Sequence, residues 1–143
     1  MIVVKRAFLI GLGLSVALTA QALEFESGEW ETQARFEVNG GLLPVPPIIS
    51  EKCLTPEDPI PNTVANKTNC VISDVTKNDQ EVGWVLHCDD KKGSLHGVGK
   101  LTFEEKAFAG VMDMEIRDDD GELENKHSFR MEGKRKGDCK EPR

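Results

Sequence analysis

Two histidines and a glutamate have the side-chain types that bind transition metals. In the antiparallel register predicted below, His87 lies opposite His96, and Glu115 follows His96 on the next strand. Two imidazoles and a carboxylate in one row could hold zinc or copper. We favour three exposed polar residues on a solvated sheet face, because no fourth ligand and no supporting hydrogen-bond partners are visible. The prediction is no metal site, with these three residues as weak candidates.

An acidic run, "DDDGELE", covers Asp118 to Glu124 and could indicate calcium. If Gly121 were the sixth residue of an EF-hand loop, Ile116 would occupy the first acidic position and His127 the final glutamate position. The loop therefore fails at both ends. An Asp-Gly hairpin turn is the favoured interpretation.

The residues that could perform catalysis do not form a recognisable set. Nucleophilic catalysis needs a nucleophile, a base and an orienting group, and no serine stands in a G-x-S-x-G context. Gly97 and Gly99 lie in a predicted strand with no following helix, so they do not form a phosphate loop. The sequence predicts a non-enzymatic protein without a cofactor.

A group of large apolar residues shares the inward-facing parity of the predicted strands. These residues are Trp30, Trp84, Met112, Met114, Phe129 and Met131. Methionines adapt to varied shapes, so the group could line an apolar surface for a small hydrophobic ligand. The favoured interpretation is an ordinary hydrophobic core.

Alternation of apolar and polar residues predicts the strands that position these side chains. Residues 29–39 alternate cleanly, which is typical of a half-buried strand. From Cys70 onward, turn signals separate five successive strands. Placing Phe103 opposite Phe108 gathers apolar residues and glycines on one face of the neighbouring strands. Large residues then lie beside Gly97 and Gly99, which permits strong curvature.

The predicted fold class is all-β, a curved antiparallel meander that forms a small open or partly closed β-barrel. The strand at 29–39 is expected to add to an edge of the meander, and closure would remove unpaired edges. A proline-rich irregular segment lies between the strand at 29–39 and the meander, with prolines at 44, 46, 47, 56, 59 and 61. Those prolines exclude a central strand. Within it, Thr55 and Pro56 suggest the start of a very short helix.

The four cysteines predict two disulfides in an oxidising compartment. A zinc site is disfavoured because no C-x-x-C pair exists. The hairpin register places Cys70 opposite Cys88, and elimination then joins Cys53 to Cys139. The second bond would tie the proline-rich segment to the C-terminal tail. The competing connectivity, Cys53–Cys70 with Cys88–Cys139, stays open.

The first 22 residues have the pattern of a secretory signal peptide. Lys5 and Arg6 precede an uncharged apolar stretch at 7–20, and Ala20-Gln21-Ala22 is a small-x-small cleavage motif. The stretch is too short to span a bilayer as a helix. We expect cleavage after Ala22 and export, with an uncleaved anchor as the alternative.

Removal of this leader leaves residues 23–143, which are expected to form a single β-domain with two disulfides and no integral membrane segment. Loss of Lys5 and Arg6 changes the net charge from −7 to −9. Such an acidic chain is a poor binder of nucleic acid. Asn66-Lys67-Thr68 is a glycosylation sequon that matters only in a eukaryotic secretory pathway. Composition leaves the oligomeric state open.

Seven motifs occur in order along the chain: "SGEWE", "CLTPED", "NCVISDV", "VGWVLHC", "GSLHGVGKLTF", "FAGVMDMEI" and "GKRKGDC". Together they resemble the domain-of-unknown-function family 3617, a family of small exported proteins of Gram-negative bacteria. The resemblance covers essentially the whole chain after the leader, and it implies a periplasmic location with oxidised cysteines. The segment before "CLTPED" is often methionine-rich in such proteins and is "GGLLPVPPIIS" here. This departure weakens any inference of metal binding there.

The sequence therefore predicts a non-enzymatic periplasmic binding or interaction module of the cell envelope, with an envelope protein as its partner. One alternative is a carrier or chaperone that holds a small hydrophobic ligand in the concave sheet. Another is a metal-binding protein that uses His87, His96 and Glu115.

Overall fold

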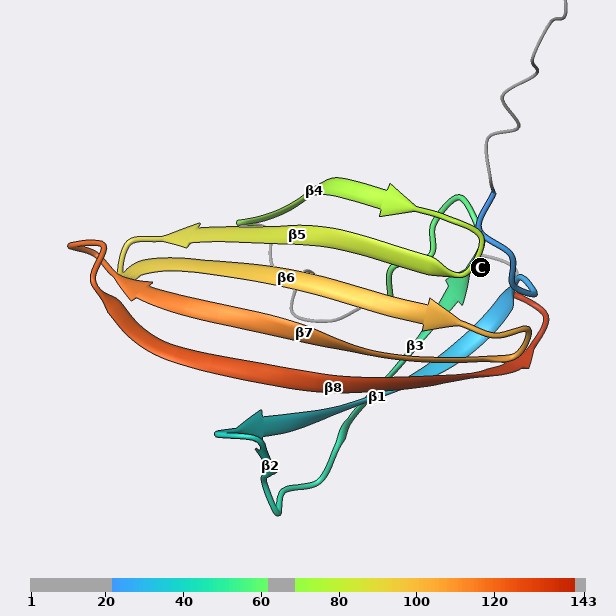
Figure 1. The fold of residues 1–143 in the computed structure, drawn as a ribbon, viewed down its shortest axis with the longest axis horizontal. Helices are drawn as coiled ribbons and strands as arrows, with labels where there is room; N and C mark the ends of the chain where they lie inside the picture. The colour runs from blue at the N-terminus through green and yellow to red at the C-terminus, as the bar shows by residue number, and fades with distance from the viewer. Residues whose placement is uncertain (1–21, 62–68, 141–143) are drawn as a thin grey trace, which may run out of the picture.

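Eight antiparallel strands hydrogen-bond into one curved sheet (Figure 1). The computed structural model describes residues 22–61 and 69–140. The strands are β1 (Gly28–Val38), β2 (Gly41–Leu42), β3 (Ile48–Leu54), β4 (Cys70–Lys77), β5 (Glu81–Asp90), β6 (Gly93–Phe103), β7 (Ala107–Asp118) and β8 (Leu123–Gly137). Their order in the sheet is β2-β1-β8-β7-β6-β5-β4, and β3 also pairs with β1.

Two expected features fall on parts of the chain that the structure does not describe. The leader lies outside the described residues except for Ala22, and the Asn66-Lys67-Thr68 sequon lies outside them as well. Within residues 22–61 and 69–140, no helix is long and apolar enough to cross a membrane.

The predicted all-β meander and its register are confirmed. Phe103 lies opposite Phe108 between β6 and β7, and Trp84 lies opposite Gly99 between β5 and β6. The strand that contains Trp30 pairs with β8, so it adds to the edge of the meander as expected. Hydrogen bonds do not close the sheet, because β4 ends the order on one side and β2 and β3 end it on the other. The protein has the open form of the predicted barrel.

The core lies on the inner face of this sheet and depends on glycines opposite large rings. Trp84 is 2% exposed, and a Cβ on Gly99 would collide with its indole. The ring of Phe108 covers Gly133 in the same way. A Cβ on Gly97 would lie 2.7 Å from the Cε atom of Met112. These glycines let bulky side chains lie flat against the neighbouring strand, as the sequence predicts for a curved sheet.

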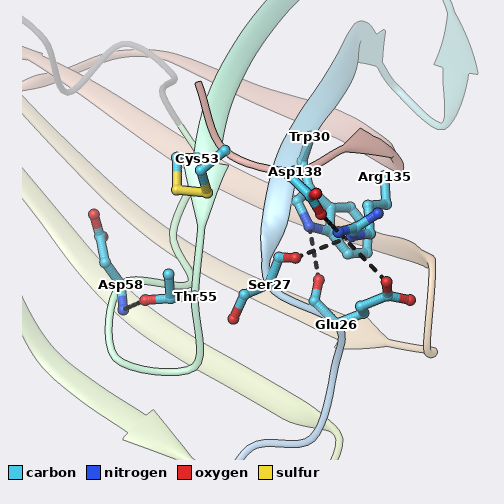
Figure 2. Close-up of a disulfide and its surroundings, with 9 residues drawn as sticks. Glu26, Ser27, Trp30, Cys53, Thr55, Asp58, Arg135 and Asp138 are labelled. Carbon is cyan, nitrogen blue, oxygen red and sulfur yellow. Dashed lines mark hydrogen bonds and ion pairs between the residues drawn. A yellow bond between two sulfur atoms is a disulfide. The ribbon is translucent and has the colours of Figure 1, made fainter. Parts of the chain in front are cut away.

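Two disulfides join the two predicted pairs. Cys70 and Cys88 face each other across β4 and β5. Cys53, in β3, is bonded to Cys139, which follows β8 (Figure 2). The two cysteines of this second bond are 86 positions apart, so it links the proline-rich segment to the C-terminal tail. The competing connectivity is absent.

The proline-rich segment contains a strand that the sequence did not predict. The short helix that was predicted in it is wrong. Residues between Pro47 and Pro56 form the edge strand β3, which pairs with β1 from Ala34 to Gly28. Thr55 does not begin a helix. Its Oγ1 accepts a hydrogen bond of 3.1 Å from the amide of Asp58, and its own amide donates to the carbonyl of Asp58. The result is a closed turn in which the side chain caps the loop.

Candidate functional site

The segment 41–49, called here the apolar arm, exposes large hydrophobic side chains. Its five exposed large hydrophobic residues, with their exposed fractions, are Leu42 (51%), Leu43 (42%), Val45 (46%), Ile48 (50%) and Ile49 (58%). No charged residue occurs from Asn39 to Ser50. In a chain where 30% of residues are charged, an uncharged segment with five exposed large apolar side chains is typical of a contact site.

A tight turn and two strand pairings fix the arm to β1. Asn39 and Gly40 adopt positive φ angles of 53° and 78°, which reverse the chain after β1. The amide of Leu43 then donates to the carbonyl of Phe36 at 2.9 Å. Pairing with β1 resumes where Ile48 lies opposite Ala34. Figure 1 shows β2 and the chain that follows it extending away from β5, β6 and β7.

Among the described residues, the arm and β4 each carry a feature that opposes addition of another strand. Pro44, Pro46 and Pro47 interrupt the arm, and proline has no amide hydrogen to donate to a ladder. On the opposite edge, β4 has a bulge where Asp74 takes a φ of 50°. Between Pro44 and Pro47, a partner would therefore contact the arm through its side chains, whereas β3 itself contains no proline.

The histidine row has the predicted register but not the arrangement of a metal site. His87 lies opposite His96, with ring centroids 6.4 Å apart, and His96 lies opposite Glu115. The Nε2 atom of His87 forms an exposed contact of 2.9 Å with the Asp89 carboxylate. Among the described residues, no group of three histidine, cysteine, aspartate or glutamate side chains could hold a metal ion.

The carboxylate of Glu115 is engaged by cations. Its Oε1 atom lies 2.9 Å from the Lys126 ammonium, and its Oε2 atom lies 3.2 Å from the Arg117 guanidinium. The hydrogen bond from Lys126 is the main cause that lowers the pKa of the Glu115 carboxyl. A surface hollow of about 510 Å³ lies beside it, where Asp113 also accepts a hydrogen bond from the hydroxyl of Ser128. The acidic groups of this hollow are therefore paired within the protein.

The six inward-facing apolar residues are packed against one another. Trp30 and Met131 are fully buried, Met112 is 1% exposed, and Phe129, the most exposed of the six, reaches 6%. All six belong to one core cluster, in which Trp30 also stacks on Phe108 at a centroid separation of 5.7 Å. A hydrophobic ligand at these residues would have to displace core side chains.

The acidic run forms a hairpin turn, as predicted. The Oδ1 atom of Asp118 accepts hydrogen bonds from the amides of Asp120 and Glu122. Gly121 adopts a φ of 83°, which suits a glycine. The carboxylate that could bind a cation is used to hold the turn.

Reasoning from the sequence did not identify the apolar arm. The signal that could have found it is the absence of charge from Asn39 to Ser50 combined with three prolines. The prolines predicted irregular structure, but nothing in the sequence analysis predicted that the leucine, valine and isoleucine residues between them would be exposed.

Comparisons with known proteins match this chain to one protein family. No curated protein and no solved structure matches the chain. Residues 25–139 match a family described as protein of unknown function, DUF3617. That match covers both disulfides, the meander and the apolar arm. The chain is therefore a member of the DUF3617 family of proteins of unknown function.

Proposed function

We propose that this protein is an exported, non-enzymatic interaction module of the bacterial cell envelope. Its contact surface is the apolar arm, and its partner is an envelope protein that presents an uncharged apolar groove. The observation that carries the proposal is the exposure of five large hydrophobic side chains on one uncharged segment held against β1.

The charge of the molecule favours a protein partner over an anionic lipid surface. Without Lys5 and Arg6 the chain carries a net charge of −9, two units more negative than the −7 of the whole sequence. Anionic lipid headgroups would repel such a chain. A groove in a protein can match an uncharged apolar segment without this penalty, because its lining is not constrained to be anionic.

Two features support export to the periplasm. The leader pattern at 1–22 is typical of a secreted precursor. All four cysteines are paired in disulfides, which persist in oxidising compartments such as the periplasm.

The contacts of two serine hydroxyls support a role other than catalysis. The hydroxyls of Ser73 and Ser128 donate to the carboxylates of Asp74 and Asp113. An activated serine nucleophile instead needs a neighbouring base that is itself held by a third group.

Site-specific photo-crosslinking tests the proposed contact surface. A photoreactive residue replaces Val45 in the arm, and the matched control replaces Val111, which is 39% exposed on β7. In the periplasm of the producing cell, the Val45 probe is expected to form one dominant adduct with an envelope protein that the Val111 probe does not form. The adduct is then identified by mass spectrometry and the partner is purified.

Affinity measurements with that partner decide the proposal. Ile49→Asp is expected to weaken binding at least about tenfold, because it would bury an unpaired charge in an apolar groove. The control Val111→Asp is expected to bind as the unmodified protein does. Equal adducts at both positions, or full affinity of Ile49→Asp, would contradict the proposal. Native mass spectrometry that finds a retained lipid would favour the carrier alternative instead.

A further inference from the structure

The outer edge of β3 has no partner strand among the residues that the structure describes. β3 pairs with β1 alone, and β1 pairs with β8 on its other side (Figure 1). The register between β3 and β1 runs from Ile48 to Leu54 without a bulge, and β3 contains no proline. Prolines protect the arm and a bulge protects β4. β3 has neither feature, so a further strand can pair with it.

Two hydrogen bonds fix the direction of the backbone groups along β1. The amide of Leu43 donates to the carbonyl of Phe36, so Phe36 turns its carbonyl toward the side of β1 that holds β2 and β3. The amide of Arg135, in β8, donates to the carbonyl of Lys106 just before β7 and therefore points away from β1. Trp30 lies opposite Arg135. In an antiparallel pair of this kind both residues point away from each other, so Trp30 turns its backbone groups toward β3.

The same alternation identifies the backbone groups that β3 presents outward. Even-numbered residues of β3 lie opposite even-numbered residues of β1, and these pairs use their backbone groups on each other. The amide and carbonyl groups of Ile49, Glu51 and Cys53 therefore point to the outer edge. They form a row of alternating donors and acceptors to which an extended chain can bond.

The charged part of β3 is engaged within the protein, whereas the part next to the arm is uncharged. The Lys52 ammonium lies 2.9 Å from the Asp58 carboxylate, and the Glu51 carboxylate lies 3.4 Å from the Lys140 ammonium. The first three residues of β3, "IIS", carry no charge and continue directly from the arm. Charged side chains therefore do not guard the end of β3 that adjoins the arm.

A second copy of β3 fits this edge poorly. A two-fold dimer needs antiparallel pairing, with outward-facing residues opposite each other. Pairing centred on Glu51 or on Lys52 sets that residue opposite its own copy, and like charges in this position are destabilising. Pairing centred on Ser50 sets Ile49 opposite Glu51 in both copies. Pairing centred on Ile49 sets Pro47, which has no amide hydrogen, opposite Glu51. These mismatches favour a strand from a different protein.

We propose that the envelope partner contributes an extended strand that pairs with the outer edge of β3. The inference rests on the proposed function and adds to it the mode of recognition, because the strand borders the groove that receives the arm. Main-chain hydrogen bonds supply affinity, and alternate side chains supply specificity. The partner residue opposite Ile49 is apolar, and the one opposite Glu51 is basic or uncharged.

Hydrogen exchange at single amides tests the pairing. In the free protein, the amides of Ile49 and Glu51 are expected to exchange at least about tenfold faster than that of Lys52, which β1 protects. The partner purified from the Val45 crosslink is then added. It is expected to slow exchange at Ile49 and Glu51 at least about tenfold, with a much smaller change at Lys52.

Two substitutions at one position separate the outward amide from the side chain. Glu51→Pro and Glu51→Ala both remove the carboxylate and its contact with Lys140, but only proline removes the amide hydrogen. The bonds between β3 and β1 do not use that amide, so both variants are expected to fold with both disulfides, which non-reducing peptide mapping checks. With the photoreactive residue at Val45, the adduct yield is expected to fall at least about tenfold in Glu51→Pro and to stay within about twofold in Glu51→Ala.

The outcomes distinguish failure of this inference from failure of the proposed function. No adduct at Val45 in the unmodified protein would contradict both. A full adduct yield in Glu51→Pro would overturn strand pairing alone and leave the arm as the contact surface. An adduct with the mass of two copies would assign the edge to a dimer.

The exchange experiment decides the inference even if Glu51→Pro does not fold. Slow exchange at Ile49 and Glu51 in the free protein would mean that another part of the chain already pairs with the edge. Unchanged exchange at these amides in the complex would mean that the partner contacts side chains only. Either result would overturn the inference.

Discussion

The indole of Trp84 lies on the backbone of Gly99, the residue directly opposite it on the neighbouring strand. This pairing allows a large ring to be 2% exposed without pushing β5 and β6 apart. It relates a feature of the sequence, a glycine in the middle of a strand, to the curvature of the whole sheet.

A methyl group at position 99 is expected to destabilise the fold. Gly99→Ala places a Cβ where the Trp84 ring lies, and overpacking of this kind typically costs about 1–3 kcal/mol. Gly137→Ala is the matched control at the end of β8, because a Cβ there meets nothing within 4 Å. Urea unfolding followed by tryptophan fluorescence gives both free energies of unfolding. Equal stability of the two variants would show that the ring can move aside at no cost.

Register and cross-links could be predicted from the sequence because they depend on pairs of strands. Placing Phe103 opposite Phe108 aligns large residues with glycines on one face, and a shift by one residue would send them to the other face. The same rule put Cys70 opposite Cys88. Once that pair is assigned, Cys53 and Cys139 remain, and the structure joins them.

Other features depend on where the sheet ends, which local pattern does not specify. β3 was missed because prolines surround it, although an edge strand needs hydrogen bonds on only one side. The exposure of Ile48 and Ile49 follows from their place on that edge. Burial of Leu23 follows from turns more than fifty residues away, since its neighbour Glu24 is bonded to Asp79. No local pattern predicts such contacts.

The two disulfides are expected to contribute unequally to stability. Cys53 and Cys139 are 86 positions apart, whereas Cys70 and Cys88 are 18 apart. In the chain-entropy model the longer loop gives about 4–5 kcal/mol and the shorter about 3 kcal/mol. Paired cysteine-to-serine variants, one for each bond, are compared by urea unfolding under non-reducing conditions. A larger loss from the Cys70–Cys88 variant would contradict the entropic account.

Acid is expected to weaken the fold partly through Glu115. Lys126 lowers the pKa of this carboxyl in the folded protein by donating a hydrogen bond to it. Because the pKa of Glu115 is lower in the folded than in the unfolded protein, its carboxylate stabilises the fold fully at pH values above the unfolded-state pKa. This stabilisation is then lost as the pH falls through the lowered value. Lys126→Met should raise the pKa of Glu115, which carboxyl NMR titration measures. The variant should also lose less of its free energy of unfolding when the pH is lowered.

An independent pair on β5 and β6 serves as the control for that titration. Lys100 lies 2.9 Å from Glu81 and is the main cause of the lowered pKa of that carboxyl. Lys100→Met should raise the pKa of Glu81 and leave Glu115 unchanged, and Lys126→Met should do the reverse. If either variant moved both carboxyls, a general change in the protein's field would explain the shifts better than the individual contacts.

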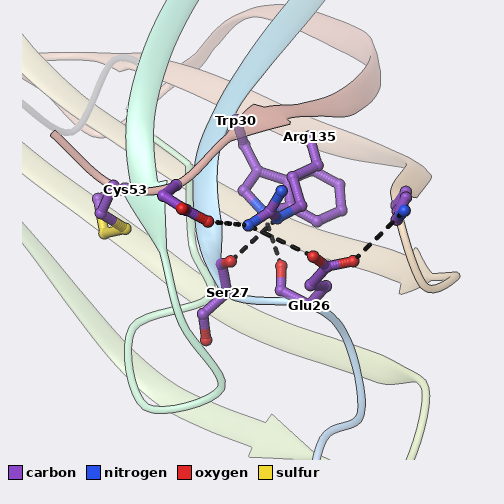
Figure 3. A network of polar contacts seen from close by, with 8 residues as sticks. Glu26, Ser27, Trp30, Cys53 and Arg135 are labelled. Atoms are coloured by element: carbon purple, nitrogen blue, oxygen red, sulfur yellow. Dashed lines mark hydrogen bonds and ion pairs between the residues drawn. A yellow bond between two sulfur atoms is a disulfide. The ribbon is translucent and has the colours of Figure 1, made fainter.

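The planar guanidinium group of Arg135 is expected to stabilise residues 24–27, the chain just before β1, because it contacts Glu26 and Ser27 (Figure 3). Its side chain is 14% exposed, and it donates in two directions, from Nε to the Ser27 carbonyl and from the terminal nitrogen to the Asp138 carboxylate. An ammonium group cannot reproduce this fork. Arg135→Lys therefore loses at least one of these two hydrogen bonds. Because Ser27 and the Asp138 carboxylate are both exposed to solvent, the expected loss is the net value of a hydrogen bond, about 0.5–1.5 kcal/mol.

Arg130 offers the matched comparison, because it forms an exposed pair with Glu37 at 2.9 Å and its side chain is 56% exposed. Solvent screens such a pair, so Arg130→Lys should change the free energy of unfolding by less than about 0.5 kcal/mol. Hydrogen exchange at the amides of Glu24 and Glu26 distinguishes a local from a global effect. Arg135→Lys should accelerate exchange there more than at the strand amides of β6, since the Arg135 side chain contacts Glu26 and Ser27 directly. Uniform acceleration throughout the sheet would mean that Arg135 stabilises the fold as a whole and not residues 24–27 in particular.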